Sequence, residues 1–283
     1  ESMPSSFPSL YKKLPFIPKD KPVKKRRKFR SKSVQPKRNP RSEPVLYYRL
    51  ENWMEDLIPV LYQKPITVIK IPVTHDSATY AIDNNSKAVS GQKYAKFTAL
   101  IGDQRLWTTT QTKSIEEQLQ IGSRFFDIRV SLEEGKFYTH HGLRARKLPY
   151  ELSVIKQFLI KHPYEFIILK IKPSSTCANF LNSLQYVIHQ ILENHHILLK
   201  AKFMTNNRTI DKLPGDLKMQ DCAGKLMVII DDRSFVEGKS DCPEIQTSKF
   251  FFGNTSLYSI WPNTRDFNTL LQKNIESQPP ITN

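Results

Sequence analysis

Two histidines, an arginine and two aspartates lie at or near the ends of segments whose composition is typical of β-strands. His75 and Asp76 follow one such segment, Asp127 and Arg129 lie within the next, and His141 ends a third. Side chains alternate along a strand, so Asp127 and Arg129 share one face. One histidine could take a proton from an attacking hydroxyl, the other could protonate a leaving oxygen, and the arginine could stabilise charge on phosphoryl oxygens. These residue types suit the cleavage of a phosphodiester.

Further polar side chains follow two later strands. Lys172 ends the strand expected around residues 165–171, and Asp231, Asp232 and Arg233 follow the strand after it. A single histidine at a strand end is usually an ordinary surface or core residue. Two histidines with an arginine on a strand between them favour catalysis instead.

Hydrophobic periodicity predicts strands that alternate with helices in the C-terminal 240 residues. The expected strands are residues 66–71, 125–130, 136–140, 165–171 and 225–230, with a sixth near 249–252, and the expected helices are 52–62, 114–121, 148–161 and 180–199. Most connections are too long for hairpins, which indicates a parallel sheet covered by helices. A doubly wound sheet and a (β/α)₈ barrel both fit this order. The glycine-rich nucleotide-binding motifs of the first are missing, and barrels carry their chemistry at the carboxyl ends of strands, so we expect a barrel.

The composition excludes several classes of protein. The chain of 283 residues has 39% hydrophobic and 25% charged residues, which excludes a fully disordered protein. No apolar run approaches the length of about 18 residues that a membrane span needs. Three widely spaced cysteines without a C-x-x-C pair argue against a disulfide framework or a zinc site and favour a reducing compartment.

Most of the net positive charge lies in the N-terminal tail. The whole chain has 43 Lys and Arg against 27 Asp and Glu, a net charge of +16. Residues 1–43 hold 14 Lys or Arg and three acids, a net of +11, which leaves +5 for the other 240 residues. Eight of the 19 prolines lie in residues 1–44, so we expect a disordered basic arm there and a folded domain over residues 45–283. The dense run at residues 24–30 fits a nuclear import signal, an RNA-binding arm, an anionic-lipid tether or a solubilising linker.

Several short motifs follow one another along the chain: Asn-Trp-Met at residues 52–54, Pro-Val-Thr-His-Asp-Ser at 72–77, Gly-Ser-Arg-Phe-Phe-Asp-Ile-Arg at 122–129, His-Gly-Leu at 141–143 and Trp-Pro-Asn at 261–263. Taken in this order, they resemble the X domain of phosphatidylinositol-specific phospholipases C. The similarity covers residues 51–275 and is to the small eukaryotic X-domain-only proteins and the secreted bacterial enzymes. This resemblance implies a distorted (β/α)₈ barrel of the TIM type that cleaves phosphatidylinositol-type lipids.

Position by position, the resemblance implies four catalytic roles. His75 matches the general base that deprotonates the inositol 2-hydroxyl, which attacks phosphorus to give inositol 1,2-cyclic phosphate. His141 matches the general acid that protonates the departing diacylglycerol oxygen. Arg129 matches the arginine that holds the phosphate where other members use calcium, and Asp76 matches the carboxylate beside the base. Calcium-dependent members have Asn at the position of Asp76, so we expect no metal and no other cofactor.

Substrate contacts and partners follow from the same resemblance. Lys172 falls where an inositol- or phosphate-contacting lysine is expected, and Arg233 is matched to a substrate-contacting arginine, a place that Asp231 fits equally well. The expected partner of this monomer is phosphatidylinositol or a glycosyl-phosphatidylinositol lipid at a membrane surface. Residues 12–41 add a basic segment for anionic lipid or nucleic acid. We expect a cytoplasmic protein that is peripheral at membranes, with a nuclear location left open by residues 24–30.

Two departures from the family pattern leave other functions open. Val73 stands where the family usually has Gly, and a β-branched residue cannot easily take a positive φ, so we expect the loop that carries His75 to be shifted or strained. The strands that bring a substrate-stacking aromatic and the carboxylate that orients the base are expected after residue 275, so we expect a barrel truncated at its C-terminus. The alternatives are a catalytically impaired X domain that binds or tethers, and a protein that binds nucleic acid or anionic lipid through its arm.

Overall fold

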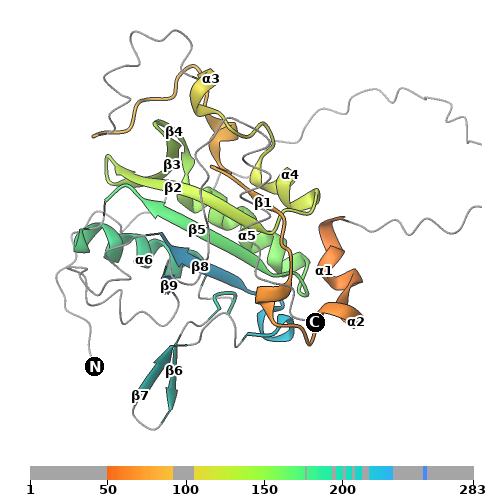
Figure 1. Cartoon of the computed structure of the whole chain (residues 1–283). Coiled ribbons are helices and arrows are strands. Elements are labelled where there is room, and N and C mark those ends of the chain that lie inside the picture. The colour runs from red at the N-terminus through yellow and green to blue at the C-terminus, as the bar shows by residue number, and fades with distance from the viewer. Residues whose placement is uncertain are drawn as a thin grey trace, which may run out of the picture. The chain divides into compact units, whose positions relative to one another are not determined.

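The folded part of the chain is an α/β structure built on a mixed sheet (Figure 1). The computed structural model describes residues 50–91, 105–175, 177–192, 196–199, 202–205, 208–211, 217–231 and 251–253. The predicted basic arm of residues 1–44, its boundary with the folded domain and Arg233 lie outside the described residues.

The central sheet has seven strands in the order β4-β3-β2-β5-β8-β9, with β1 paired to the first part of β2. Neighbouring strands are parallel except that β3 runs antiparallel to both β2 and β4. A separate antiparallel hairpin is formed by β6 and β7. The strands are β1 (Val73–Thr74), β2 (Phe125–Glu133), β3 (Lys136–His141), β4 (Leu143–Lys147), β5 (Ile167–Pro173), β6 (Lys202–Thr205), β7 (Arg208–Asp211), β8 (Leu226–Ile230) and β9 (Phe251–Gly253).

The sheet differs from the predicted parallel barrel in two respects. The chain returns from β2 to β3 through Glu134 and Gly135, which both have positive φ (52° and 71°), the backbone conformation of a tight hairpin turn. This hairpin makes the sheet mixed rather than parallel. Along the described strands the sheet also does not close on itself. The prediction was wrong about the hairpin because Glu-Gly is a weaker turn signal than Asn-Gly or Asp-Gly.

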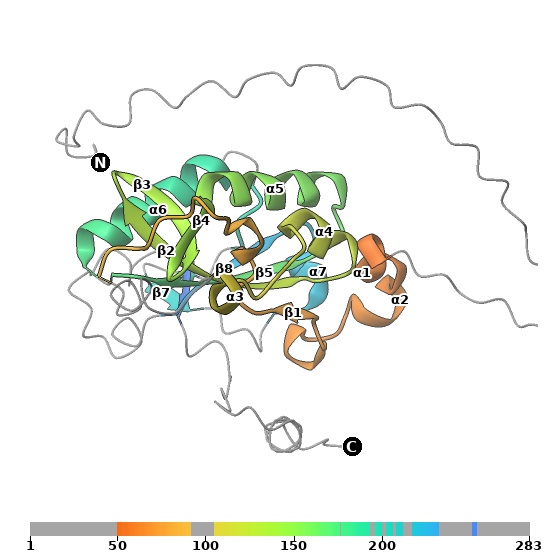
Figure 2. The ribbon, with the colours of Figure 1, turned by 90° about the horizontal axis from the view of Figure 1, so that it is seen from above.

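Helices α4, α5 and α6 cover one face of the sheet (Figure 2). Helix α4 begins with the predicted capping box, in which the side chains of Ser114 and Glu117 each accept the other residue's backbone N–H. Helix α6 ends at Leu192, before the predicted end at residue 199. In the described part of the chain no helix is long and apolar enough to cross a membrane. The helices are η2 (Leu50–Asn52), α1 (Trp53–Asp56), α2 (Ile58–Leu61), η3 (Ile66–Val68), η4 (Thr79–Ala81), α3 (Arg105–Thr108), α4 (Ile115–Gln120), α5 (Leu148–Lys161), α6 (Ala178–Leu192) and α7 (Met219–Cys222).

Proline explains two further differences from the expected elements. The helix expected over residues 52–62 is divided into α1 and α2 at Leu57. Pro59 is the second residue of α2, and because it lacks an N–H it cannot continue the hydrogen bonds of α1. The strand expected over residues 66–71 instead begins as the 3₁₀ helix η3, between two prolines, and only β1 pairs with β2.

The face of the sheet beneath the helices forms the main core. Phe126, Ile128 and Val130 of β2 point into this core and are at most 2% exposed. Equivalent residues of β5 and β8 extend it, and α5 contributes Leu152 and Ile155 from its inner side. Successive side chains of a strand point to opposite faces of the sheet. In β2 the apolar residues therefore face the core, and the polar residues between them face the other side.

The opposite face of the sheet changes character along the strands. In register order the pairs between β2 and β5 are Phe125 with Ile168, Asp127 with Lys170, and Arg129 with Lys172. The first pair belongs to a second apolar cluster, which α1, α7 and η3 cover. The next two pairs are charged. The carboxyl ends of the parallel strands therefore present ionisable side chains, while their amino ends stay in the core.

A fully buried ion pair joins the first helices to the amino end of the sheet. Arg124 Nε donates to Glu165 Oε2 at 2.6 Å, and both side chains are 0% exposed. The guanidinium also donates to the backbone carbonyl groups of Leu50, Glu51, Leu119 and Ser123. Glu165 Oε1 accepts the backbone N–H groups of Met54 and Glu55. The pair thus supplies partners for backbone groups at the ends of η2, α1 and α4.

Desolvation works against this ion pair. Burial raises the pKa of the Glu165 carboxyl and lowers the pKa of the Arg124 guanidinium, and their mutual attraction opposes both changes. The Arg124 guanidinium also lies 4.7 Å from the ring centroid of Phe158 in α5. Because a buried charge without a partner costs far more than the pair itself, the two residues depend on each other.

Replacement of Glu165 by Ala should lower the free energy of unfolding by about 3–5 kcal/mol, because Arg124 would be left charged and buried. The double change Arg124→Met and Glu165→Leu should be less harmful than the single change, since it removes both charges. Urea denaturation of the purified chain measures these differences.

The matched control is Glu134→Gln. Glu134 forms an ion pair with Arg144 at 3.1 Å but is 64% exposed, so its loss should leave the urea midpoint nearly unchanged. Equal effects of Glu165→Ala and Glu134→Gln would contradict the role given to the buried pair.

Candidate active site

The turn that carries His75 and Asp76 leaves strand β1 beside β2. Val73 and Thr74 are extended and pair in parallel with the first two residues of β2. Val73 has no positive φ; the left-handed residue of the turn is Asp76, with φ 44°. The expectation of strain at Val73 was therefore wrong, because an extended backbone accepts a β-branched residue readily. The strained position falls on the residue that we place at the centre of the site.

Ser77 fixes the turn to β2. Its backbone N–H donates to the carbonyl of Asp127 at 2.8 Å, and its hydroxyl donates to the carbonyl of Thr74 at 2.8 Å. The same oxygen accepts the backbone N–H of Asp127 at 3.0 Å. Gln118 of α4 donates to the Ser77 carbonyl at 2.8 Å. This buried network places His75 and Asp76 over the polar face of β2.

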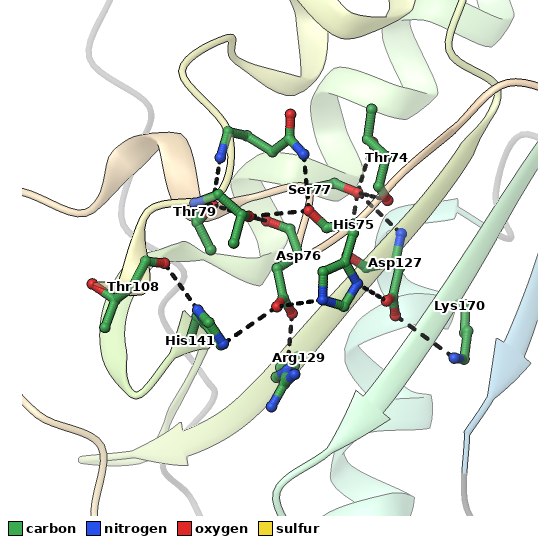
Figure 3. Close-up of polar contacts among 12 residues, drawn as sticks. Thr74, His75, Asp76, Ser77, Thr79, Thr108, Asp127, Arg129, His141 and Lys170 are labelled. Carbon is green, nitrogen blue, oxygen red and sulfur yellow. Dashed lines mark hydrogen bonds and ion pairs between the residues drawn. The ribbon is translucent and has the colours of Figure 1, made fainter. Parts of the chain in front are cut away.

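The carboxylate of Asp76 lies between the side chains of Arg129, His75 and His141 (Figure 3). Its Oδ1 accepts from Arg129 Nε at 2.8 Å, and its Oδ2 is 3.1 Å from His75 Nε2 and 3.4 Å from His141 Nε2. Burial alone would raise the pKa of Asp76, yet the hydrogen bond from His75 and the charges of His141 and Arg129 hold the pKa below its ordinary value. Four of the predicted catalytic residues thus meet at one carboxylate.

Asp127 binds the second nitrogen of His75, a contact that the sequence reasoning missed. His75 Nδ1–H donates to Asp127 Oδ2 at 2.8 Å. Hydrogen bonds to Asp127 and Asp76 raise the pKa of His75 from 6.5 to about 9, although partial burial acts in the opposite direction. Strand β2 thus supplies a carboxylate that orients His75, whereas the carboxylate expected after residue 275 lies outside the described residues. The signal was the alternation that puts Asp127 and Arg129 on one face.

Lys170 and Asp231 extend the row of charges beyond Asp127. Lys170 Nζ is 3.9 Å from Asp127 Oδ1 and 2.9 Å from Asp231 Oδ2. The row therefore alternates in sign from His75 through Asp127 and Lys170 to Asp231. Lys170 was not predicted as a site residue, although it stands next to Asp127 in the register of β5 and β2. A register between two strands is not readable from either strand alone.

His141 is oriented by the backbone of α3. Its Nδ1–H donates to the carbonyl of Thr108 at 3.0 Å. This contact leaves Nε2 as the nitrogen that faces Asp76 and the centre of the site. The residues after α3 support the other histidine, because the side chains of Thr110 and Gln111 donate to the His75 carbonyl at 3.1 and 3.0 Å.

His140 differs from its neighbour His141 in its environment. It is 5% exposed, and its Cα partner across the β2–β3 ladder is Arg129. Burial and the charge of Arg129 lower the pKa of His140 to about 4, so its ring is neutral beside the site. Of the two adjacent histidines, only His141 contacts Asp76 in the described structure.

The two predicted substrate-binding residues have different outcomes. Lys172 lies on β5 in register with Arg129 and is exposed, so the structure brings it to the charged face beside the predicted catalytic residues. Arg233 lies outside the described residues, whereas Asp231, the alternative at that place, forms the ion pair with Lys170.

Three side chains could in principle hold a cation. Ligand atoms of His75, Asp76 and Asp127 all lie within 4.8 Å of one another, and carboxylate oxygens are ligands that Ca²⁺ prefers. However, Arg129 already donates to Asp76, and His75 donates to Asp127. Donors of the chain itself therefore already pair with both carboxylates.

Replacement of Asp127 by Asn should lower the pKa of His75 from about 9 toward its ordinary value of 6.5, because the strongest charged acceptor of its Nδ1–H is lost. Chemical shifts of the His75 ring protons, followed by NMR from pH 5 to 10, measure this change. The neutral ring of His140 is the internal control, since it should stay unprotonated over the whole range in both proteins. A wild-type His75 that titrates near 6.5 would contradict the arrangement.

The chain has relatives among proteins of known sequence. No protein-family profile matches it. The chain is 35% identical over 127 residues to human PI-PLC X domain-containing protein 2, covering 42% of this chain and 42% of that protein. It is 31% identical over 235 residues to the mouse protein of the same name, covering 78% of this chain and 62% of that protein.

Structure comparison also matches part of this chain to solved bacterial proteins. Phosphatidylinositol-specific phospholipase C from Listeria monocytogenes has a TM-score of 0.45 at 23% identity, over 66% of this chain and 58% of that chain. The enzyme from Staphylococcus aureus has a TM-score of 0.45 at 22% identity, over 64% and 53%. This chain spans 42% to 62% of the length of the human and mouse relatives named above. The sequence comparison confirms what the motifs predict: the chain is related to the phosphatidylinositol-specific phospholipase C X-domain family.

Proposed function

We propose that this chain cleaves phosphatidylinositol-type lipids as a phosphodiesterase. The observation that carries the proposal is the carboxylate of Asp76, which lies between His75, His141 and Arg129 within 3.4 Å of each. Two imidazoles on either side of a phosphate-binding guanidinium suit a transfer in which one proton is removed and another is supplied. The relationship to PI-PLC X domain-containing proteins supports a phosphodiester of a lipid as the substrate class.

The proposed reaction begins with the inositol 2-hydroxyl. His75 removes its proton as the oxygen attacks phosphorus, and a new oxygen–phosphorus bond closes a 1,2-cyclic phosphate. The bond between phosphorus and the glycerol oxygen breaks, and His141 Nε2 delivers a proton to that oxygen, which releases diacylglycerol. Water can then open the cyclic phosphate to inositol phosphate with the two histidines in exchanged roles. No proton is gained or lost in the first step overall.

Arg129 supplies the positive charge that the phosphate needs. Its Nε–H is used by Asp76, while its side chain is 33% exposed, so the remaining guanidinium N–H groups can reach a phosphate above the sheet. Asp76 holds the guanidinium in place and keeps both histidines near it. A planar guanidinium can bind two phosphoryl oxygens at once, which a lysine cannot.

The protonation of His75 sets a condition on this mechanism. With a pKa of about 9, its ring is an imidazolium in most molecules at neutral pH, and an imidazolium cannot act as a base. At pH 7, two units below that pKa, the His75 ring is neutral and able to act as a base in about one molecule in a hundred. Catalysis by the free enzyme should therefore increase as the pH rises toward 9.

An exposed hydrophobic element lies next to the site. Leu106 and Trp107 of α3 are 79% and 69% exposed, and the following residue, Thr108, binds His141. Exposed aromatic and aliphatic side chains at the entrance of a lipid-cleaving site suit contact with a membrane surface. We therefore propose a protein that is peripheral at membranes, on their cytoplasmic side.

Release of inositol 1,2-cyclic phosphate from phosphatidylinositol vesicles tests the proposed reaction. His75→Ala and His141→Ala should each lower kcat by about a hundredfold to ten-thousandfold, because each change removes a proton-transfer group. Arg129→Lys should also lower it by about a hundredfold, since the planar pair of donors is lost. The value of kcat/KM should rise from pH 6 to 9. In Asp127→Asn the same rise should occur at lower pH.

The reaction should continue in the presence of a calcium chelator, and a loss there would contradict the role given to Arg129. His162→Gln is the matched control, since His162 follows helix α5 and its ring contacts Asn52 rather than a residue of the site. If the folded wild-type chain binds the vesicles but releases no product, the enzyme proposal is wrong and the chain is a binding or tethering module.

Replacement of both Leu106 and Trp107 by Ser should weaken binding to phosphatidylinositol vesicles by about tenfold or more, since about 1.5–3 kcal/mol is lost for each large apolar side chain that no longer enters the lipid. Vesicle sedimentation measures the change. The control replaces Val60 and Val68, which are 62% and 64% exposed on other helices, by Ser. Equal loss of binding in both double variants would remove α3 from the membrane contact.

A further inference from the structure

A buried hydrogen bond anchors the segment that follows the catalytic turn. The hydroxyl of Tyr80, in η4, donates to Glu151 Oε1 at 2.8 Å. Glu151 lies near the start of α5 and is 2% exposed. A carboxyl group this deeply buried is costly unless its surroundings compensate for lost water. Its contact with η4 shows where that cost is offset.

The bond connects the two halves of the site. Helix η4 follows directly after Asp76 and Ser77, and the Thr79 N–H donates to the Asp76 carbonyl at 3.1 Å. On its other side η4 packs against β3 and β4, and β3 ends at His141. Helix α5, which carries Glu151, begins immediately after β4. A shift of η4 relative to α5 would therefore change the separation between Asp76 and His141.

The surroundings of Glu151 make the bond sensitive to its charge. In the described part of the chain, the titratable groups that act on Glu151 are Tyr80 of η4 and Arg146 of β4. The Arg146 guanidinium lies 5.7 Å from the ring centroid of Tyr80 and 4.5 Å from that of Tyr150. Burial raises the pKa of Glu151 to about 7, against the effects of Tyr80 and Arg146. Burial also raises the pKa of Tyr80, so that its hydroxyl stays a donor.

The second carboxyl oxygen has a different environment. Among the described residues, Glu151 Oε2 is buried and has no hydrogen-bond partner. A protonated carboxyl would place its O–H there without an acceptor, whereas an ionised carboxyl needs only the donor that Tyr80 supplies. The hydrogen bond from Tyr80 is also stronger to a carboxylate than to a neutral carbonyl oxygen.

We propose that Tyr80 and Glu151 are positioning residues that hold the His75–Asp76 turn against the His141 strand, and that ionisation of Glu151 tightens this hold. The inference rests on the proposed function for the chemistry of the site. It adds a titratable group outside the catalytic residues, the carboxyl of Glu151, which loses its proton near neutral pH. Turnover therefore gains a dependence on pH that belongs to neither catalytic histidine.

The kinetic test compares Tyr80→Phe and Glu151→Gln with the control Tyr150→Phe. Tyr150 lies under the same guanidinium but is 49% exposed. Tyr80→Phe should lower kcat for cyclic phosphate release by roughly fivefold to tenfold, the factor that corresponds to one hydrogen bond, with KM unchanged. Glu151→Gln keeps a neutral acceptor for Tyr80, so it should match the wild type at pH 6, and its activity relative to the wild type should fall between pH 6 and 8, while the rise due to His75 is common to both proteins. Tyr150→Phe should match the wild type.

Two readouts are independent of turnover, so they separate this inference from the proposed function. The folded pKa of Glu151, about 7, lies above its ordinary value of 4.5, so the neutral form stabilises the fold below pH 4.5 and that contribution is lost as the pH rises through 7. The Tm of the wild type should therefore fall relative to that of Glu151→Gln between pH 5 and 8. The NMR signals of the His75 and His141 rings should shift in Tyr80→Phe and not in Tyr150→Phe.

The outcomes are distinct. If the wild type releases no cyclic phosphate, the proposed function fails, while the Tm and NMR measurements still decide the positioning role. A Tm difference between wild type and Glu151→Gln that does not change with pH would overturn the inference. Identical histidine signals in Tyr80→Phe and the wild type would overturn it as well.

Discussion

Ser77 ties the catalytic turn to the central strand, and the geometry of the site depends on this residue. It is 0% exposed, and its backbone N–H and hydroxyl both bond to backbone groups of β2 or of the turn itself. Backbone partners do not rotate as side chains do, so the turn has one position relative to Asp127 and Arg129. The fold itself thus holds the groups proposed for catalysis in place, so that on the proposed function the binding of a substrate would not have to spend free energy on arranging them.

Charge balance is the second principle of this fold. On the polar face of the sheet, Asp76, Asp127 and Asp231 each lie beside a cationic side chain. At the opposite end of the strands, Glu165 is matched by Arg124 in the dry core. The two ends of the strands differ in solvent access. The ion pair of Arg124 and Glu165 is fully buried and joins helices to the sheet, whereas His75 and Arg129 at the other end are partly exposed. Access to solvent separates the structural ion pair from the groups that can meet a substrate.

Local patterns predicted much of this structure. The alternation of β2, the capping box at Ser114 and the amphipathic helix α5 depend on neighbours in sequence, and each appears as expected. The resemblance to X domains also identified His75, Asp76, Arg129 and His141, which the structure brings together. Such features can be predicted from the sequence because they depend on residues close together in the chain or on a motif of the family.

The remainder depends on contacts between distant segments. Lys170 lies beside Asp127 because of the register between β5 and β2. His75 contacts Asp127 because the hydrogen bonds of Ser77 fix the position of the turn relative to β2. The 3₁₀ helix at residues 66–68 replaced a predicted strand although its residues favour β structure, because flanking prolines and exposure outweighed that preference. Neither strand register nor competition between propensity and burial is encoded in one segment.

Strand β2 builds the core and the site with alternate residues, which limits how the protein can change. Phe126 and Ile128 belong to one function of the strand, and Asp127 and Arg129 belong to the other. Insertion or deletion of a single residue in this stretch would exchange the two faces, placing charges among the helices and apolar side chains at the site. Substitutions in β2 can therefore be tolerated one face at a time, whereas a change in its length removes stability and chemistry together.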